Sequence, residues 1–348
     1  MRVIYWNLTD RCNLRCKHCY LYDTLASPHQ NLPHELGTEE CLKIVEQFSE
    51  ANVFYVSVVG GEPFCKPDIM VILSRMGEKK FWTEITTNST LIDEKTAQNL
   101  ADIGIKGIFA SLEGPCAELN DFIRGEGSFK KALQGIEYLK DFEIPFRIQM
   151  TVTKKNCDKI EEMANFCLGI GAERIIFKYF NDIPSKNQFS SYLRLGREDI
   201  FSAAQKIAEL KAAYADGFIS SDLDSTLVFL SSEPDPAVKD KSAVRCDLGS
   251  TQLGILSNGD VVPCIYMTDI VLGNVMKTHL SDIPNSPEFK RIKRLRELTV
   301  DDMNEQCSQC EWKYVCGGGC RGRAYLKYGD LLSPDPQKCL LAKGELCE

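Results

Sequence analysis

The 348-residue chain has no excess of positive charge and no long apolar run. Its 41 Lys and Arg residues are outnumbered by 49 Asp and Glu residues, giving a formal net charge of −8. Nucleic-acid-binding proteins are usually basic, so we expect no nucleic-acid partner. No apolar run approaches the roughly 20 residues that span a bilayer. The N-terminus MRVIYWNLTDRC also lacks the features of a secretory signal, so we expect a cytoplasmic protein with no membrane partner.

Cysteine, by contrast, is abundant, with 16 residues. Cytosolic thiols are kept reduced, so structural disulfides do not explain this number. Four of the cysteines stand alone, mostly in segments with a helical pattern, and we expect them in the core: Cys41, Cys116, Cys157 and Cys167. The others are mostly clustered at short, fixed intervals, which is typical of metal ligation.

Apolar segments alternate with amphipathic ones from residue 3 to about residue 215. The apolar segments are rich in β-branched and aromatic residues and predict strands at 3–9, 54–60, 83–88, 107–113, 146–152 and 174–180. Helices are predicted over 38–51, with Thr38 as N-cap, and over 93–104, 128–142, 159–171 and 197–217.

Six successive βα units predict an α/β protein with a parallel sheet and helices outside it. The sheet is either doubly wound or curled into a partial barrel. In both cases ligands bind at the carboxyl ends of the strands.

The pattern changes near residue 215, which divides the chain into a first domain, 1–215, and a second, 216–348. Residues 231–244 form a polar connection, and 253–263 predict a hairpin with a type I′ turn at Asn258-Gly259. The short, cysteine-rich segments that follow have too little apolar content to fold by core packing alone. We therefore expect bound metal to stabilise the fold of the second domain.

Three cysteines, Cys12, Cys16 and Cys19, directly follow the first predicted strand with the spacing C-x3-C-x2-C. Three thiolates can hold three irons of a cubane cluster, which usually takes four cysteines, and leave the fourth iron open to another ligand. The alternative is a zinc site with His18 as the fourth ligand.

The run CNLRCKHC resembles the signature of the radical S-adenosylmethionine (radical SAM) enzymes. The resemblance implies a partial (β/α)6 TIM-like barrel, a [4Fe–4S] cluster on Cys12, Cys16 and Cys19, and SAM on the unique iron. In that family an electron from the cluster cleaves SAM, and the resulting 5′-deoxyadenosyl radical abstracts hydrogen from the substrate. It also implies an electron donor such as ferredoxin or flavodoxin, and a spacer role for His18.

Further motifs match the family's SAM-binding positions at the ends of successive strands. In the family, the motif matched by Glu62 receives the SAM ammonium, an arginine like Arg124 meets the carboxylate, and residues after the fourth and fifth strands reach the ribose. The residues implied to bind SAM are Gly60, Gly61, Glu62, Pro63, Asn88, Ser111, Glu113, Arg124 and Gln149.

The C-terminal cysteines resemble the SPASM domain, which carries two auxiliary iron–sulfur clusters in a subset of radical SAM enzymes, and we expect both to be [4Fe–4S] clusters. A zinc ribbon is the alternative, but it leaves the hairpin cysteine and the N-terminal triplet unexplained. By position, the outer cluster would be held by Cys307, Cys310, Cys316 and Cys339, and the inner one by Cys246, Cys264 and Cys320. The fourth inner position is left to Cys347, to Asp247 or to substrate.

The resemblance leaves the substrate open. The first hypothesis is a maturase that cross-links or oxidises a ribosomally made peptide or small protein. Because the chain begins almost at its first strand, a leader peptide would need a separate recognition partner or the SPASM surface. The second is an enzyme acting on porphyrin side chains in tetrapyrrole metabolism. A sulfatase maturase is disfavoured because Ile265 stands where those enzymes carry an Asp, and the non-enzymatic alternative is an iron–sulfur electron carrier. No catalytic acid or base is assigned.

Overall fold

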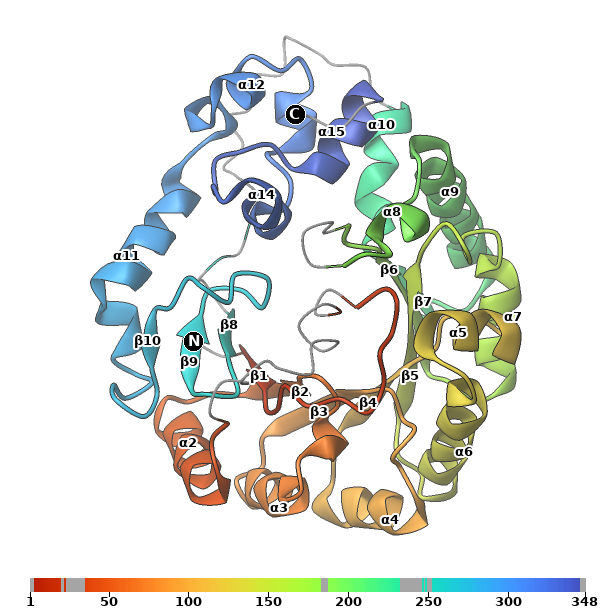
Figure 1. Cartoon of the computed structure of the whole chain (residues 1–348), viewed down its shortest axis with the longest axis vertical. Helices are drawn as coiled ribbons and strands as arrows, with labels where there is room; N and C mark the ends of the chain where they lie inside the picture. The colour runs from red at the N-terminus through yellow and green to blue at the C-terminus, as the bar shows by residue number, and fades with distance from the viewer. Residues whose placement is uncertain are drawn as a thin grey trace.

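The protein is described here from a computed structural model covering residues 3–19, 22, 35–182, 187–231, 246, 248 and 252–344 (Figure 1). The strands are β1 (Val3–Asn7), β2 (Tyr55–Val59), β3 (Trp82–Thr87), β4 (Gly107–Ser111), β5 (Phe146–Val152), β6 (Arg174–Tyr179), β7 (Ile219–Ser221), β8 (Gln252–Ile255), β9 (Asp260–Val262) and β10 (Gly273–Asn274).

The helices of the first half are α2 (Thr38–Glu50), α3 (Ile69–Glu78), α4 (Glu94–Ile103), α5 (Ala117–Arg124), α6 (Ser128–Asp141), α7 (Ile160–Gly169), α8 (Ser190–Leu193) and α9 (Arg197–Ala213). Those of the second half are α10 (Val228–Ser231), α11 (Pro287–Arg294), α12 (Glu305–Ser308), α13 (Lys313–Cys316), α14 (Arg321–Tyr328) and α15 (Pro336–Lys343).

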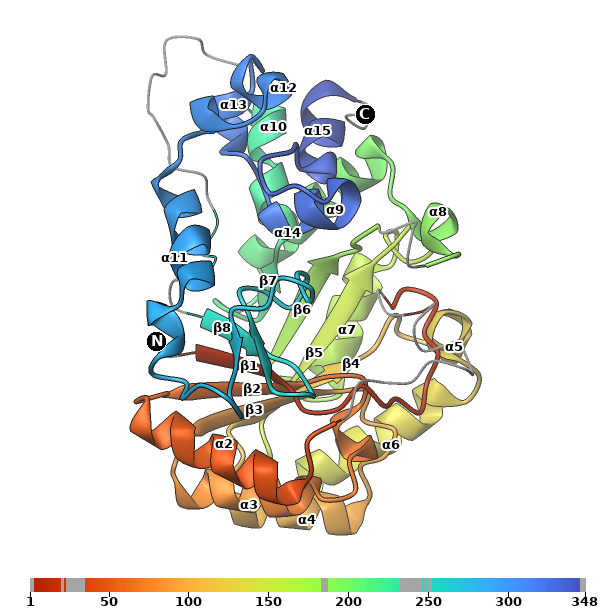
Figure 2. The same ribbon diagram turned by 60° about the vertical axis from the view of Figure 1, so that its left-hand side comes forward.

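The ten strands of the described residues belong to one open sheet, in the order β10-β9-β8-β1-β2-β3-β4-β5-β6-β7. Neighbouring strands from β1 to β7 pair in parallel, and β8 is parallel to β1, whereas β9 and β10 are antiparallel additions. The sheet curves, with α2 to α7 and α9 along its outer side (Figures 1 and 2). The six predicted βα units and the curled α/β sheet are therefore confirmed, as an open rather than a closed barrel.

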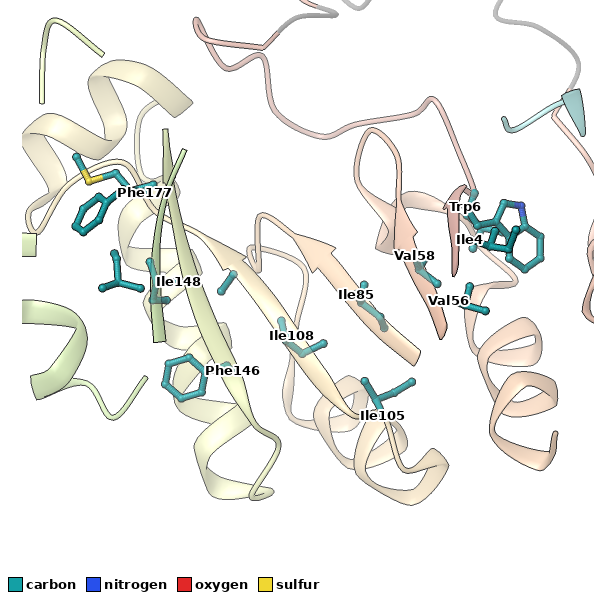
Figure 3. Close-up of a cluster of buried hydrophobic side chains, with 14 of the residues drawn as sticks. Ile4, Trp6, Val56, Val58, Ile85, Ile105, Ile108, Phe146, Ile148 and Phe177 are labelled. Carbon is teal, nitrogen blue, oxygen red and sulfur yellow. The ribbon is translucent and has the colours of Figure 1, made fainter. Parts of the chain in front are cut away.

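The main core lies between the sheet and these helices, because alternate residues of each strand point outward. Ile4, Val56, Ile85, Ile108 and Ile148 are all fully buried, and Figure 3 shows them along the sheet. Trp6 packs edge-on against Phe48 of α2, with ring centroids 5.2 Å apart. A long apolar side chain on each strand thus fixes which face is covered and which is left for the site.

The inner face of the sheet is mostly polar. Near its amino end, the Glu84 carboxylate accepts hydrogen bonds from the Tyr55 hydroxyl at 2.5 Å and from the Arg147 guanidinium at 2.5 Å. Ser111 and Gln149 lie opposite each other at the carboxyl end. The amino end is thus occupied by a paired charge network, and the neutral polar groups lie at the end where α/β proteins bind ligands.

Both edges of the sheet come from the predicted second domain. β7 extends the sheet beyond β6, and the hairpin of β8 and β9 joins β1 on the opposite side. The boundary at residue 216 remains a prediction, since the two parts share one sheet.

The hairpin is present where it was predicted, but its turn is not type I′. That turn needs positive φ at both central residues, whereas here Gly259 has φ of +84° and Asn258 does not have positive φ. The Gly259 N–H donates to the Leu256 carbonyl at 2.9 Å, and the Leu256 N–H to the Asp260 carbonyl at 2.8 Å. This is the longer loop that ends in a left-handed glycine.

Several local predictions also need correction. The N-cap of α2 is Gly37 rather than Thr38. Helices α3 and α5 were not predicted. Cys41 and Cys167 are buried as expected, but Cys116 is exposed and Cys157 is only half-buried. No helix in the described part of the chain is long and apolar enough to cross a membrane.

Candidate active site

The cysteine loop that follows β1 is held against the end of β2 by backbone hydrogen bonds. The N–H of Gly61 donates to the Thr9 carbonyl at 2.8 Å, and that of Glu62 donates to the Arg11 carbonyl at 2.8 Å. A Cβ atom at Gly60 would lie 2.4 Å from the Thr9 oxygen, and one at Gly61 would lie 2.3 Å from the Arg11 oxygen. The two glycines therefore allow this loop to approach closely.

Glu62 is fully buried, and its carboxylate links β2 to the end of β3. It accepts hydrogen bonds from the Thr87 hydroxyl at 2.7 Å, the Asn88 N–H at 2.7 Å and the Phe64 N–H at 3.2 Å. Burial nevertheless raises the pKa of this carboxyl to about 7, against the lowering effect of its donors. Pro63, also buried, begins the short turn that follows.

Asn88 connects the same strand end to the cysteine loop. Its side-chain amide donates to the Asn13 side-chain oxygen at 2.9 Å, and its own oxygen accepts from the Thr90 hydroxyl at 2.6 Å. This contact was not predicted, because nothing in the sequence indicates which strand end faces the loop.

A buried charge cluster supports the other side of the loop. Arg124 donates to Glu113 through Nη2 at 2.5 Å and Nε at 3.1 Å, and its Nη1 lies 3.9 Å from the Cys16 sulfur. The second Glu113 oxygen accepts the Thr151 N–H at 2.7 Å. Arg124 thus places positive charge directly beside a cysteine of the triplet.

His18 belongs to this cluster rather than serving only as a spacer. Its Nε2 lies 3.4 Å from the Glu113 carboxylate, and the other ring nitrogen is buried without a hydrogen-bond partner in the structure. Burial lowers the pKa of His18 to about 4, so the ring is neutral at pH 7.

The three thiols of the loop are close enough for the charges of Cys12 and Cys19 to act on Cys16. Burial raises the pKa of Cys16 to about 12, while Arg124 acts in the opposite direction. Binding of iron requires thiolates, so cluster assembly at this loop must release protons. Three thiols beside a fixed guanidinium fit a cluster of net negative charge.

Cys246, Cys264 and Cys320 form a second group, in which each of the first two feels the charge of Cys320. Burial raises the pKa of Cys264 to about 11. Tyr266 is close by, and its hydroxyl accepts from the Asn181 amide at 2.7 Å, which links this group to the end of β6. Asp247 and Cys347, the candidate fourth ligands, lie outside the described residues.

The four cysteines predicted for the outer cluster line one pocket between α12, α13 and α15, and they are Cys307, Cys310, Cys316 and Cys339. Cys339 is in a disulfide in this structure, which was not predicted, so its assignment as a ligand rests on its place in this cavity. Within the described parts of the chain, no three His, Cys, Asp or Glu side chains could hold a single metal ion. A multi-iron cluster does not require such convergence, because its thiolates bind different irons.

The buried carboxylate of Asp335 joins the two auxiliary groups. It accepts the Cys320 N–H at 2.7 Å and pairs with Arg323 at 2.7 Å, and it also lines the cavity of the outer group. Gly319, with φ of +65°, lies so close that a Cβ there would be 2.4 Å from this carboxylate. The glycine run CGGGC therefore permits a tight contact that the sequence does not reveal.

Comparison with protein families identifies two domains in the chain. The model of the Radical SAM superfamily matches residues 6–167, which include the N-terminal triplet. The model of SPASM, an iron–sulfur cluster-binding domain, matches residues 246–311. The chain is a radical SAM enzyme with a SPASM domain. Its first domain implies a [4Fe–4S] cluster and SAM, and its SPASM domain implies auxiliary iron–sulfur clusters.

Relatives of the enzyme carry different names. The AdoMet-dependent heme synthase of Nitratidesulfovibrio vulgaris is 29% identical over 96% of this chain and 91% of its own length. The mycofactocin maturase MftC of Mycolicibacterium smegmatis is 28% identical over 95% of this chain and 81% of its own. The crystal structure of Streptococcus suis SuiB bound to precursor peptide SuiA matches with a TM-score of 0.75 at 22% identity, covering 97% of this chain and 75% of that one. This last likeness shows the fold alone.

Proposed function

We propose that the enzyme modifies a ribosomally made peptide or small protein, by cross-linking it or by oxidising a side chain. The inner face of the sheet carries this proposal. In β1 to β6, as described, the only cation of this face near its carboxyl end is Lys178, since Arg147 is paired with Glu84 and Arg174 lies at the amino end. A polar surface with a single cation suits a peptide, whereas a porphyrin with several carboxylates needs several cations. The similarity to mycofactocin maturase supports the same choice.

The chain's own residues have distinct roles in this proposal. Cys12, Cys16 and Cys19 hold the cluster, which with SAM supplies a 5′-deoxyadenosyl radical that abstracts hydrogen. Arg124 offsets the charge of the cluster beside Cys16. Ser111 and Gln149, both half-buried, face each other where the family's ribose contacts lie.

Glu62 and Asn88 fix the SAM end of the pocket through their links between β3 and the cysteine loop. If Glu62 binds the SAM ammonium, its burial has a functional explanation. A cation beside this carboxyl would lower its pKa and offset the cost of ionising it there.

Two auxiliary [4Fe–4S] clusters complete the proposal. The inner one is assigned to Cys246, Cys264 and Cys320, and the outer one to the four cysteines that line the common cavity. Asp335 and its partner Arg323 lie between the two sites.

The second candidate function is modification of porphyrin side chains. It is favoured by one observation, the similarity to AdoMet-dependent heme synthases over nearly the whole chain. The charges described on the inner face do not favour it.

One experiment separates the two functions. The anaerobically reconstituted enzyme, given dithionite, SAM and either a deuterated candidate peptide from a neighbouring reading frame or a deuterated iron porphyrin, should transfer deuterium into 5′-deoxyadenosine only with the peptide. Transfer from the porphyrin alone would reverse the assignment. A variant lacking the three N-terminal cysteines serves as the control for chemistry that does not need SAM cleavage.

A further inference from the structure

A patch of exposed aromatic rings and half-buried lysines covers the outer side of the cysteine loop. It consists of Lys17, Phe122, Tyr192 and Lys155, which come from the loop, α5, α8 and the segment after β5. Phe122 and Tyr192 are 36% and 50% exposed, although large aromatic side chains usually lie inside. Figures 1 and 2 both show the loop passing beside α5, with α8 on the same side of the molecule.

The four residues of this Lys17–Lys155 patch are in continuous contact. The Lys17 ammonium lies 3.6 Å from the Phe122 ring centroid, and the Lys155 ammonium 3.9 Å from that of Tyr192. The two rings are 6.0 Å apart. Cation–π contacts hold the ammonium groups in place without neutralising them.

The patch is cationic on a chain whose net charge is −8. Among the described residues, no carboxylate forms an ion pair with Lys17 or Lys155, whereas the neighbouring Lys154 is paired with Asp199 at 2.6 Å. Two acids, Glu118 and Asp121, lie on α5 with Phe122, and both Asp121 oxygens accept hydrogen bonds from residues 127–129. The patch itself contributes the two ammonium groups of Lys17 and Lys155 and no carboxylate.

A single layer of residues separates the patch from the cluster thiols. The Lys17 N–H donates to the Ile123 carbonyl at 2.7 Å, and the Cys16 sulfur lies 4.0 Å from the Arg124 carbonyl. Phe122 points to the surface, while Arg124, two residues later, points to Cys16. An electron entering through this face would cross only this layer to reach Cys16.

We propose that the Lys17–Lys155 patch is the docking surface for a small acidic one-electron carrier protein. The reduced carrier gives up one electron and the cluster at Cys12, Cys16 and Cys19 gains it, with no bond made or broken in this step. Acidic carriers are complementary to the two ammonium groups, and the exposed rings supply the apolar centre of a small, transient interface. The inference depends on the radical SAM activity and not on the identity of the substrate.

The test compares the double variant K155E/Y192S with a matched control, F54S/K106E, which changes an exposed aromatic and a lysine at the amino ends of the strands. An acidic flavodoxin, reduced photochemically, is mixed with each reconstituted enzyme. We expect cluster reduction by flavodoxin to slow roughly tenfold in K155E/Y192S at low salt and not in the control. Reduction by dithionite should be unchanged in both.

A second measurement does not depend on turnover. Binding of oxidised flavodoxin, followed by calorimetry, should weaken about tenfold in K155E/Y192S, and binding by the wild type should weaken with added salt. Equal reduction rates and affinities in the two variants would overturn the proposal. So would a raised KM for the substrate with unchanged reduction by flavodoxin, which would make the patch a substrate surface. Because dithionite bypasses docking, loss of substrate modification under dithionite would count against the proposed function alone.

Discussion

Gly61→Ala tests how the cysteine loop is held. The added Cβ would lie 2.3 Å from the Arg11 carbonyl oxygen, and real Cβ atoms do not approach below 3.0 Å, so the loop must retreat by at least 0.7 Å, which is 3.0 minus 2.3. Gly61 does not have positive φ, so alanine there introduces no backbone strain of its own.

Retreat of the loop weakens the two hydrogen bonds that join it to residues 61 and 62. Two such bonds contribute about 1 kcal/mol each, and overpacking costs about 1–3 kcal/mol, so the free energy of unfolding should fall by about 3–5 kcal/mol. Because Arg11 precedes Cys12, the N-terminal cluster should also be lost. Iron per chain should then fall by about four, and no 5′-deoxyadenosine should form.

The assays are urea unfolding of the cluster-free protein and iron analysis after reconstitution. Gly169→Ala, at the end of α7, is the matched control, since a Cβ there meets nothing within 4 Å. It should leave iron content unchanged and stability equal or slightly higher. Wild-type stability and iron content in Gly61→Ala would refute the argument from close approach.

Three further predictions follow from the buried charges and thiols. Asp335→Asn should lower the free energy of unfolding by about 3–5 kcal/mol in urea titrations, because it leaves a buried guanidinium without its charge partner. Burial raises the folded pKa of Glu62 above its unfolded value, to about 7, so its protonated form is favoured in the fold. The cluster-free protein should therefore lose up to about 3 kcal/mol as pH rises from about 4.5 through 7, and Glu62→Gln should remove this slope in urea titrations between pH 5 and 8. Replacing Cys12, Cys16 and Cys19 together with alanine should remove about four irons per chain and abolish SAM cleavage. The auxiliary iron signals should remain in the electron paramagnetic resonance spectrum.

The strands were predictable because buried parallel strands are short apolar runs with a strong composition signal. Helix α5 was not, because it has only eight residues and Asn120 and Arg124 share its buried face with Ile123. The same two residues carry part of the site. The polar residues on the buried face of α5 thus contribute to the site and also make the helix hard to predict from its sequence pattern.

The sequence indicated candidate residues for the site but not the contacts between them. Motif spacing indicated Glu62 and Glu113, but the sequence gives no distance between strand ends, so the links to Thr87 and His18 could not be inferred. The turn at Asn258 shows the same limit. Its side chain accepts the Asp260 N–H at 3.0 Å, which favours another loop with the same Asn-Gly dipeptide.

The pairing of β1 with β8 has a consequence for synthesis on the ribosome. Val3 pairs with Gln252, so one edge of β1 stays unpaired until nearly three quarters of the chain has been translated. Open strand edges recruit other chains, and contacts so distant in sequence form slowly. A nascent or truncated first domain therefore exposes an unpaired edge of β1 that can pair with other chains. By pairing β8 with this edge, the second domain protects the barrel from aggregation.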